Sequence, residues 1–183
     1  MVRQQFRNSR LHKSYIWALM FDMMNTKMFL CLVFFLSAIT VQGNAQKFRF
    51  DRSAFYDAMA SDNLESVNRQ LNFLQGTSIN EKEAYEGALL MKKAGLMPKA
   101  KEKLSLFKSG RLKLESAIKK DMANTEFRFL RLIIQEHAPK AVNYSNELEN
   151  DSLLIRTNYK TLPEVVQEAI HDYSKKSKVL KAF

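Results

Sequence analysis

The chain has 183 residues but only one cysteine, five glycines, three prolines and three histidines. Cys31 lies in an apolar run near the N-terminus, so the chain after it can form neither a disulfide nor a thiolate metal site. The few glycines form no glycine-rich phosphate loop, and no serine stands in the Gly-x-Ser-x-Gly turn of hydrolases. The protein must therefore fold by packing alone, and it contains no nucleophile motif.

The histidines do not indicate a metal site either. His12 precedes the apolar run, and His137 and His171 lie 34 residues apart on different predicted helices. A metal site on one helix needs ligands three or four residues apart, and neither histidine has such a partner histidine. Both are interpreted as surface or helix-end residues. The sequence predicts no metal and no cofactor, and it favours a non-catalytic protein without excluding an enzyme.

Residues 28–41 form the one long uncharged apolar run of the chain. About 20 apolar residues are needed to span a bilayer, so this run is short for a membrane helix and fits the core of a secretory signal peptide. Lys27 supplies positive charge before it, and Gly43 and Ala45 are the small residues expected at a cleavage site. We expect a leader over 1–45.

Residues 46–183 are then the mature chain, predicted to be a single helical domain without a transmembrane span. Such a protein is exported, and it is either periplasmic or secreted. The alternative is a protein that stays tethered by an uncleaved N-terminal segment.

Glycine and proline in the mature chain stand where helices are expected to begin or end. Gly76 and Gly95 follow apolar runs, and Pro98 and Pro163 precede others. Asp62 and Thr161 each have an acid three residues later, which is the pattern of an N-cap. Apolar residues recur every three or four positions without sustained alternation, so the predicted fold is all-α. The expected helices are 53–60, 62–75, 81–94, 98–120 (with a break near Gly110), 124–137, 146–158 and 163–180.

These helices follow one another as hairpins, packed either as a short solenoid or as an irregular bundle. The expected core residues are Phe55, Leu71, Leu89, Leu104, Phe127, Leu130, Ile134, Leu154, Val166 and Ile170. The stretch from Ala84 to Phe107, with Gly87, Ala100 and Leu104, resembles tetratricopeptide-like helical hairpins. The spacing from the glycine to the alanine is one residue too long for that repeat, and its large aromatic pattern is missing.

A second resemblance rests on the stretch EFRFLRLIIQEHAP at residues 126–139, together with Tyr144, Asp151, Ile170 and Tyr173. It resembles a group of short exported bacterial proteins without an assigned function. The resemblance implies export and a helical domain, and it supplies no catalytic residues.

The helix expected at 124–137 is apolar around most of its circumference, but Arg128, Arg131 and Gln135 form one polar stripe along it. If this stripe is buried, its guanidinium groups need carboxylate partners, and Asp151 or Glu126 could provide them. The stripe is then either the floor of a groove for an anionic ligand or a structural ion pair. It could also face water.

Basic residues gather between Lys92 and Lys120, where ten of them face only Glu102 and Glu115. We call this set the basic face, and it is expected to be the charged side of helices whose other side is apolar. The face could attract an anionic membrane surface, acidic glycans or an acidic protein, or it could simply be solvated. Its ten members are Lys92, Lys93, Lys99, Lys101, Lys103, Lys108, Arg111, Lys113, Lys119 and Lys120.

The sequence thus favours a non-catalytic exported scaffold or binding module, whose partner is a protein or an anionic component of the cell envelope. Nucleic acid is a poor candidate, because no recognition motif appears. The oligomeric state stays open. The alternative is a small exported enzyme or ligand carrier with a pocket near Arg128, Arg131 and Gln135. A deep pocket with converging polar groups favours this alternative, and an open basic surface favours a binding module.

Overall fold

The computed structural model describes residues 50–181, and every helix discussed below lies in one compact unit that covers them. The predicted leader and its cleavage site lie outside the described residues. Residues 50–181 contain seven α-helices, two short 3-10 helices and no strand, so the all-α prediction is confirmed. The helices are α2 (Arg52–Ala60), α3 (Leu64–Gln75), α4 (Lys82–Leu96), α5 (Ala100–Lys120), α6 (Thr125–His137), α7 (Leu148–Asn158) and α8 (Glu164–Ser174), and the 3-10 helices are η1 (Lys140–Val142) and η2 (Tyr159–Thr161).

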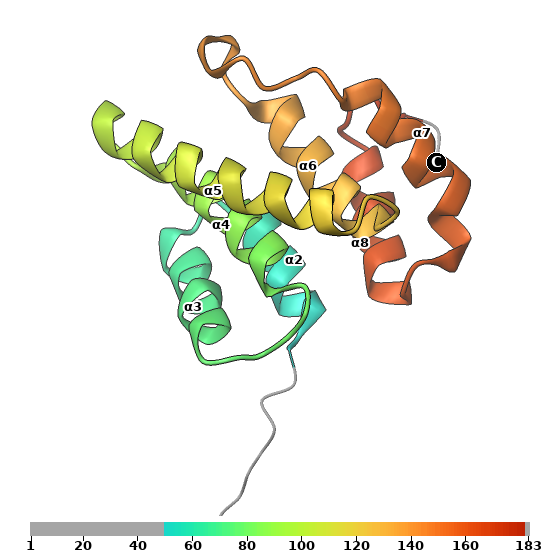
Figure 1. The fold of residues 1–183 in the computed structure, drawn as a ribbon, viewed down its shortest axis with the longest axis horizontal. Helices are drawn as coiled ribbons and strands as arrows, with labels where there is room; N and C mark the ends of the chain where they lie inside the picture. The colour runs from blue at the N-terminus through green and yellow to red at the C-terminus, as the bar shows by residue number, and fades with distance from the viewer. Residues whose placement is uncertain (1–49, 182–183) are drawn as a thin grey trace, which may run out of the picture. The chain divides into compact units, whose positions relative to one another are not determined.

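Helices α4 and α5 form a long hairpin across the domain, and the turn between them projects at one end (Figure 1). Helix α6 contacts both helices of this hairpin and also α7, while α3 packs on α4. Helix α2 contacts α3 and also α8, so the first and the last described helices lie side by side. Within residues 50–181, no helix is both long enough and apolar enough to cross a membrane.

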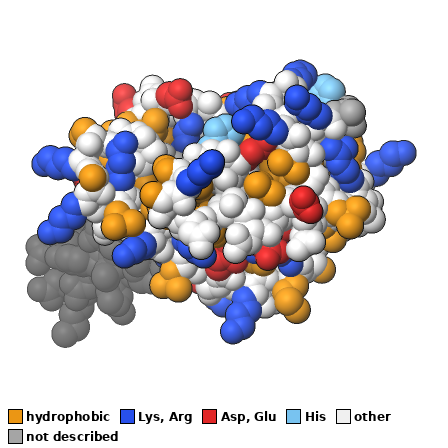
Figure 2. Space-filling model, turned by 90° about the horizontal axis from the view of Figure 1, so that it is seen from above, with side chains coloured by type: hydrophobic (Ala, Val, Ile, Leu, Met, Phe, Trp, Pro, Cys, Tyr) orange, Lys and Arg blue, Asp and Glu red, His pale blue; other side chains and the backbone are white. Residues whose placement is uncertain are grey.

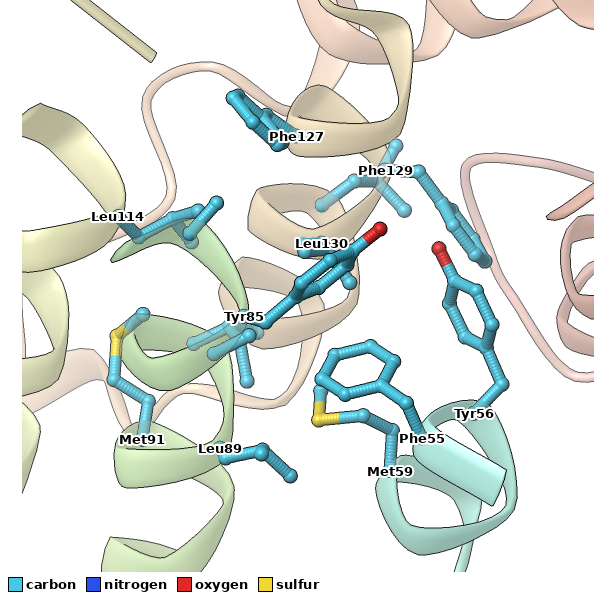
Figure 3. Close-up of a cluster of buried hydrophobic side chains, with 14 of the residues drawn as sticks. Phe55, Tyr56, Met59, Tyr85, Leu89, Met91, Leu114, Phe127, Phe129 and Leu130 are labelled. Carbon is cyan, nitrogen blue, oxygen red and sulfur yellow. The ribbon is translucent and has the colours of Figure 1, made fainter. Parts of the chain in front are cut away.

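The core is formed where α2, α4 and α6 meet (Figure 3). Phe55 and Tyr85 are fully buried with ring centroids 4.7 Å apart, and Phe129 of α6 contacts the ring of Tyr56 at 5.9 Å. Burial of such apolar surface is the main stabilising contribution in a chain without disulfides. Most of the predicted core residues are buried, including Leu89, Leu130 and Ile170.

Two glycines allow α4 and α5 to approach closely. A Cβ atom on Gly110 would lie 2.6 Å from the carbonyl oxygen of Gly87, and one on Gly87 would lie 2.8 Å from that of Gly110. Any side chain at either position would push the helices apart. The sequence analysis expected a break near Gly110, but α5 runs unbroken through it. Gly110 is present because of this close approach.

The predicted helix boundaries differ from the structure in several places, and Thr161 does not cap α8, whose N-cap residue is Pro163. Asn63, not Asp62, caps α3 by accepting hydrogen bonds from the N–H groups of Glu65 and Ser66. Gly95 lies inside the last turn of α4 instead of ending it. The last helix ends at Ser174, six residues before its predicted end.

After α8 the chain turns back onto the domain and buries Leu180 completely. The Glu136 carboxylate accepts hydrogen bonds from the hydroxyl of Ser177 at 2.8 Å and from the backbone N–H of Lys178. Arg156 donates to the carbonyl oxygen of Val179 at 3.1 Å. This return segment, residues 175–180, is held by side chains from two other helices, which periodicity cannot reveal.

Candidate functional site

The basic face lies on the α4–α5 hairpin, and its members fall into two groups. Near the crossing of the two glycines, Lys113 donates to Glu86 at 2.9 Å and Lys120 pairs with Glu83 at 2.5 Å. We call this part, residues 82–91 and 110–120, the base of the hairpin. Lys82, Lys113 and Lys120 pair with acids of α4, so much of the charge of the base is neutralised, while Lys119 is exposed and makes no ion pair within the described residues.

The other group occupies residues 92–109, which we call the tip of the hairpin. The tip contains six lysines and one acid, Glu102. Lys92 pairs with Asp62 at 3.2 Å. Among the described residues the other five lysines make no ion pair, and all except Lys93 are exposed. These five are Lys93, Lys99, Lys101, Lys103 and Lys108. The tip therefore carries an uncompensated positive charge.

Two leucines interrupt this charge on the outer side of α5. Leu104 is 46% exposed and Leu112 is 74% exposed. Residues four and eight positions apart lie on the same side of a helix, so Lys108 stands between the two leucines. Figure 2 shows apolar side chains among lysine and arginine side chains at the end of the domain where the α4–α5 turn projects. We call Lys101, Leu104, Lys108 and Leu112 the outer face of α5.

The exposure of Leu104 corrects the predicted core. Its neighbours Phe107 and Leu114 are buried against the rest of the domain. Leu104 lies one turn before Phe107 at the edge of the buried side of α5, and 46% of its surface remains exposed. Its spacing of three residues from Lys101 and four from Lys108 could have placed it among the lysines.

The arginine stripe of α6 lies inside the domain, and it is separate from the tip. Arg131 is 4% exposed, and its Nε and Nη2 atoms donate to the two carboxylate oxygens of Asp151, each at 2.7 Å. Its Nη1 atom donates to Glu115 at 3.1 Å, and Glu147 lies 3.5 Å from Nη2. Burial lowers the pKa of Arg131, but the hydrogen bonds and charges of these carboxylates outweigh it and raise the pKa above the ordinary value.

Arg128 joins the same network from the preceding turn. Its Nη1 atom lies 3.4 Å from Asp151, and its Nη2 atom donates to the carbonyl oxygen of Met122 at 3.0 Å. Asp151 is 1% exposed, as expected for a charged group only when it is fully paired. Three carboxylates and two guanidinium groups leave no free positive charge here. The stripe has the geometry of a structural ion-pair network.

An open hollow of about 230 Å³ lies beside this network. Arg111, Tyr144 and Glu147 line it, together with Arg131 and Gln135. Gln135 is 4% exposed, and its Oε1 atom is buried without a hydrogen-bond partner in the described part of the chain. Arg111 of the basic face lies over the Tyr144 ring at 4.6 Å, and the Tyr144 hydroxyl donates to Glu115. Spacing gave no signal for Tyr144 or Glu115 at this place, because they come from different elements.

A second buried carboxylate, Glu126, was expected as a partner for the arginine stripe and has other partners. Its Oε1 atom accepts hydrogen bonds from Tyr56 at 3.0 Å and from Tyr85 at 2.8 Å. The two phenol oxygens point toward each other (Figure 3). Arg52 lies 3.5 Å away and also donates to Tyr85. Burial raises the pKa of Glu126, and these hydrogen bonds and the Arg52 charge oppose the rise.

The two described histidines lie at helix ends. His137 is the last residue of α6 and is exposed, with its Nδ1 atom 3.0 Å from the carbonyl oxygen of Ile133. His171 is exposed in α8 and lines a second open hollow of about 320 Å³ with Tyr159 and Glu164. Within residues 50–181, no three His, Cys, Asp or Glu side chains converge as metal ligands.

No family model, no curated protein and no solved structure matches this chain. The site must therefore be judged by its chemistry. The interior network has no unpaired guanidinium group, whereas the tip presents five lysines without ion-pair partners in the described domain, together with the exposed Leu104.

Proposed function

We propose that the protein is a non-catalytic, exported helical binding module that holds an anionic component of the cell envelope on the tip of the α4–α5 hairpin. The observation that carries this proposal is the set of five tip lysines that make no ion pair within residues 50–181. Of the other lysines of the hairpin, Lys82, Lys92, Lys113 and Lys120 pair with acids on α4 or in the α2–α3 connection, and Lys119 does not.

The lysines of the tip are better suited to bind an extended anionic surface than to recognise a single small anion. Lysine is a mobile point charge, whereas specific recognition of one phosphate or carboxylate usually relies on the planar fork of arginine. Each lysine near an anionic surface contributes about 1 kcal/mol, so five of them together attract such a surface strongly at moderate ionic strength. The six described arginines all have partners within the domain, including Arg128 and Arg131 in the interior network and Arg111 against the Tyr144 ring.

Export is the part of the proposal that rests on the sequence. The apolar run 28–41, with Lys27 before it and small residues at positions 43 and 45, supports cleavage after Ala45. Mass spectrometry of the protein recovered from cells tests it: a mature chain that begins at Gln46 is expected. An intact leader would favour the tethered alternative.

Retention on immobilised dextran sulfate tests the binding surface. We compare the chain from Gln46 onward with a variant in which Lys99, Lys101 and Lys103 become glutamine. The matched control changes Lys160, Lys175 and Lys176, which lie on η2 and after α8, to glutamine. Loss of retention in the first variant alone, at unchanged melting temperature, supports the proposal. Equal losses in both variants would show that only the net charge matters and would reject it.

The hollow beside the arginine network supports the alternative, a carrier of a small ligand. The buried Oε1 atom of Gln135 lacks a partner among the described residues and could accept a hydrogen bond from a ligand donor. A thermal-shift series with free amino acids tests this alternative. It requires a ligand that raises the melting temperature of the wild-type chain and not that of Gln135→Leu.

A further inference from the structure

The outer face of α5 exposes two leucines that the binding of a soluble polyanion does not need. Lysines alone are sufficient for electrostatic attraction, yet Leu104 and Leu112 are 46% and 74% exposed beside them. Single exposed leucines are normal on protein surfaces and require no explanation. Here both lie on the same side of one helix, at a spacing of eight residues, with Lys101 and Lys108 beside them.

The composition of the tip argues against a protein as the partner. The residues that dominate protein interfaces are tryptophan, tyrosine and arginine. Residues 92–109 contain none of them, and their single aromatic residue, Phe107, is buried. Lysine and leucine together are typical of helices that lie in the interface of an anionic bilayer, with leucine below the headgroups and lysine at their level.

The geometry of the hairpin also fits a flat partner. The α4–α5 turn projects at one end of the domain (Figure 1), and along α5 the side chains of Leu104 and Leu112 are 46% and 74% exposed. Leu106 and Leu96 are half-buried and hold this end to the domain core, so the outer face is presented on a folded helix. A surface can therefore approach Leu104 and Leu112 together without unfolding the hairpin.

We infer that the partner is an anionic phospholipid bilayer, on which α5 lies with Leu104 and Leu112 inserted among the lipid chains and its lysines at the phosphates. This inference rests on the proposed function, because it names the chemistry of the partner bound at the same tip. Insertion of the two leucines adds an apolar contribution to the free energy of binding, which a soluble polyanion without lipid chains cannot provide.

Vesicle co-sedimentation tests the inference with the chain from Gln46 onward. The vesicles consist of phosphatidylcholine alone or with phosphatidylglycerol. We compare wild type with the double variant Leu104→Ser and Leu112→Ser. The matched control is Leu153→Ser, which removes a leucine that is 67% exposed on α7, away from the α4–α5 turn (Figure 1). We expect binding only to the phosphatidylglycerol vesicles, and a loss of about tenfold or more in affinity in the double variant alone.

Dextran sulfate separates this inference from the function on which it rests. The double leucine variant keeps all its lysines, so its retention on dextran sulfate should equal that of wild type. If it also binds the vesicles like wild type, the leucines do not insert and the lipid inference is rejected while the proposed function stands. If wild type binds dextran sulfate but no vesicle, the lipid inference is rejected in the same way.

Insertion can also be observed directly, because the chain after Cys31 contains no cysteine. Leu112→Cys, labelled with an environment-sensitive fluorophore, should shift its emission to the blue on phosphatidylglycerol vesicles. The same label at Leu153→Cys should not shift. Equal emission at both positions would contradict insertion of the outer face.

Discussion

The base and the tip of the α4–α5 hairpin are built from similar sequence, yet they have opposite surroundings. Both halves of α5 contain leucines spaced among lysines. At the base, Leu114 is fully buried and Lys113 and Lys120 pair with acids of α4, while Leu112 and Lys119 of the base stay exposed. At the tip, Leu104 is exposed and Lys108 is unpaired within the described chain.

The difference between the two halves comes from their neighbours. The base crosses α4 at two glycines and faces α6, which supplies Arg131 to Glu115. The tip extends beyond these contacts. An amphipathic pattern therefore shows that a helix has two sides, while the tertiary structure decides whether each leucine stabilises the core or remains available to a partner.

The largest expected loss of stability comes from a side chain introduced where Gly87 and Gly110 bring α4 and α5 together. In Gly110→Val, the new side chain would meet the Gly87 carbonyl oxygen and the Met91 backbone, so we expect a loss of about 4 kcal/mol or more in the free energy of unfolding. Urea unfolding measures it. The control is Gly95→Ala at the tip, where a Cβ atom meets nothing within 4 Å. It should raise stability by about 0.5 kcal/mol, because alanine is the better helix former.

The next effect comes from the ion-pair network that joins the base to α6. Asp151→Asn leaves the buried Arg131 with a neutral partner, and we expect a loss of about 3 kcal/mol in the free energy of unfolding. Combining it with Arg131→Met should cost less than the sum of the single changes, because the two side chains are coupled. Retention of the folded variant on dextran sulfate should be unchanged. Weakened retention would mean that the network contributes to the binding surface.

A pair of leucine substitutions compares base and tip directly. Leu114→Ala should lower the free energy of unfolding by about 3 kcal/mol, because it leaves a cavity at a fully buried position. Leu104→Ala should change it by no more than about 0.5 kcal/mol. Thermal and urea unfolding of the two variants measure both losses of stability. Similar losses for both would mean that Leu104 is covered in solution and that the tip is not a free surface.

The smallest effect on stability is expected from the titration of Glu126, which accepts a hydrogen bond from Tyr85 of the base. Its pKa is raised in the folded state, so the folded protein binds this proton more tightly than the unfolded chain does. The resulting contribution to stability is fully present below the pKa of the unfolded chain and is lost as the pH rises through the folded pKa. Glu126→Gln does not titrate. The stability of wild type relative to Glu126→Gln should therefore fall as the pH rises from 4 to 7, as measured by urea unfolding.

Much of the fold follows from local pattern. The seven predicted helices are present, and most of their ends lie within a few residues of the predicted positions, because periodicity, glycine and proline act over short distances. The return segment after Ser174 could not be predicted. It is held by Glu136 and Arg156, which lie far from it in sequence.

The sequence predicted the charged residues of the candidate site, but it did not predict that Leu104 is exposed among them. The lysines of the tip stand out in the sequence, and Asp151 was expected as a partner of the arginine stripe. Leu104 was assigned to the core because its spacing fits a buried stripe as well as an exposed one. The partners of Glu126, Tyr56 and Tyr85, come from 70 and 41 residues away, so no local pattern brings them together.

The contact of α2 with α8, together with the burial of Leu180, has a consequence for the timing of folding. As the chain is synthesised, its N-terminal helices emerge without the residues that complete their packing: Val166, Ile170, Tyr173 and Leu180. The packing of the domain is complete only when nearly all of the described chain has been synthesised, because α2 contacts α8. The part of α2 that α8 contacts therefore stays uncovered until the last helix has been made.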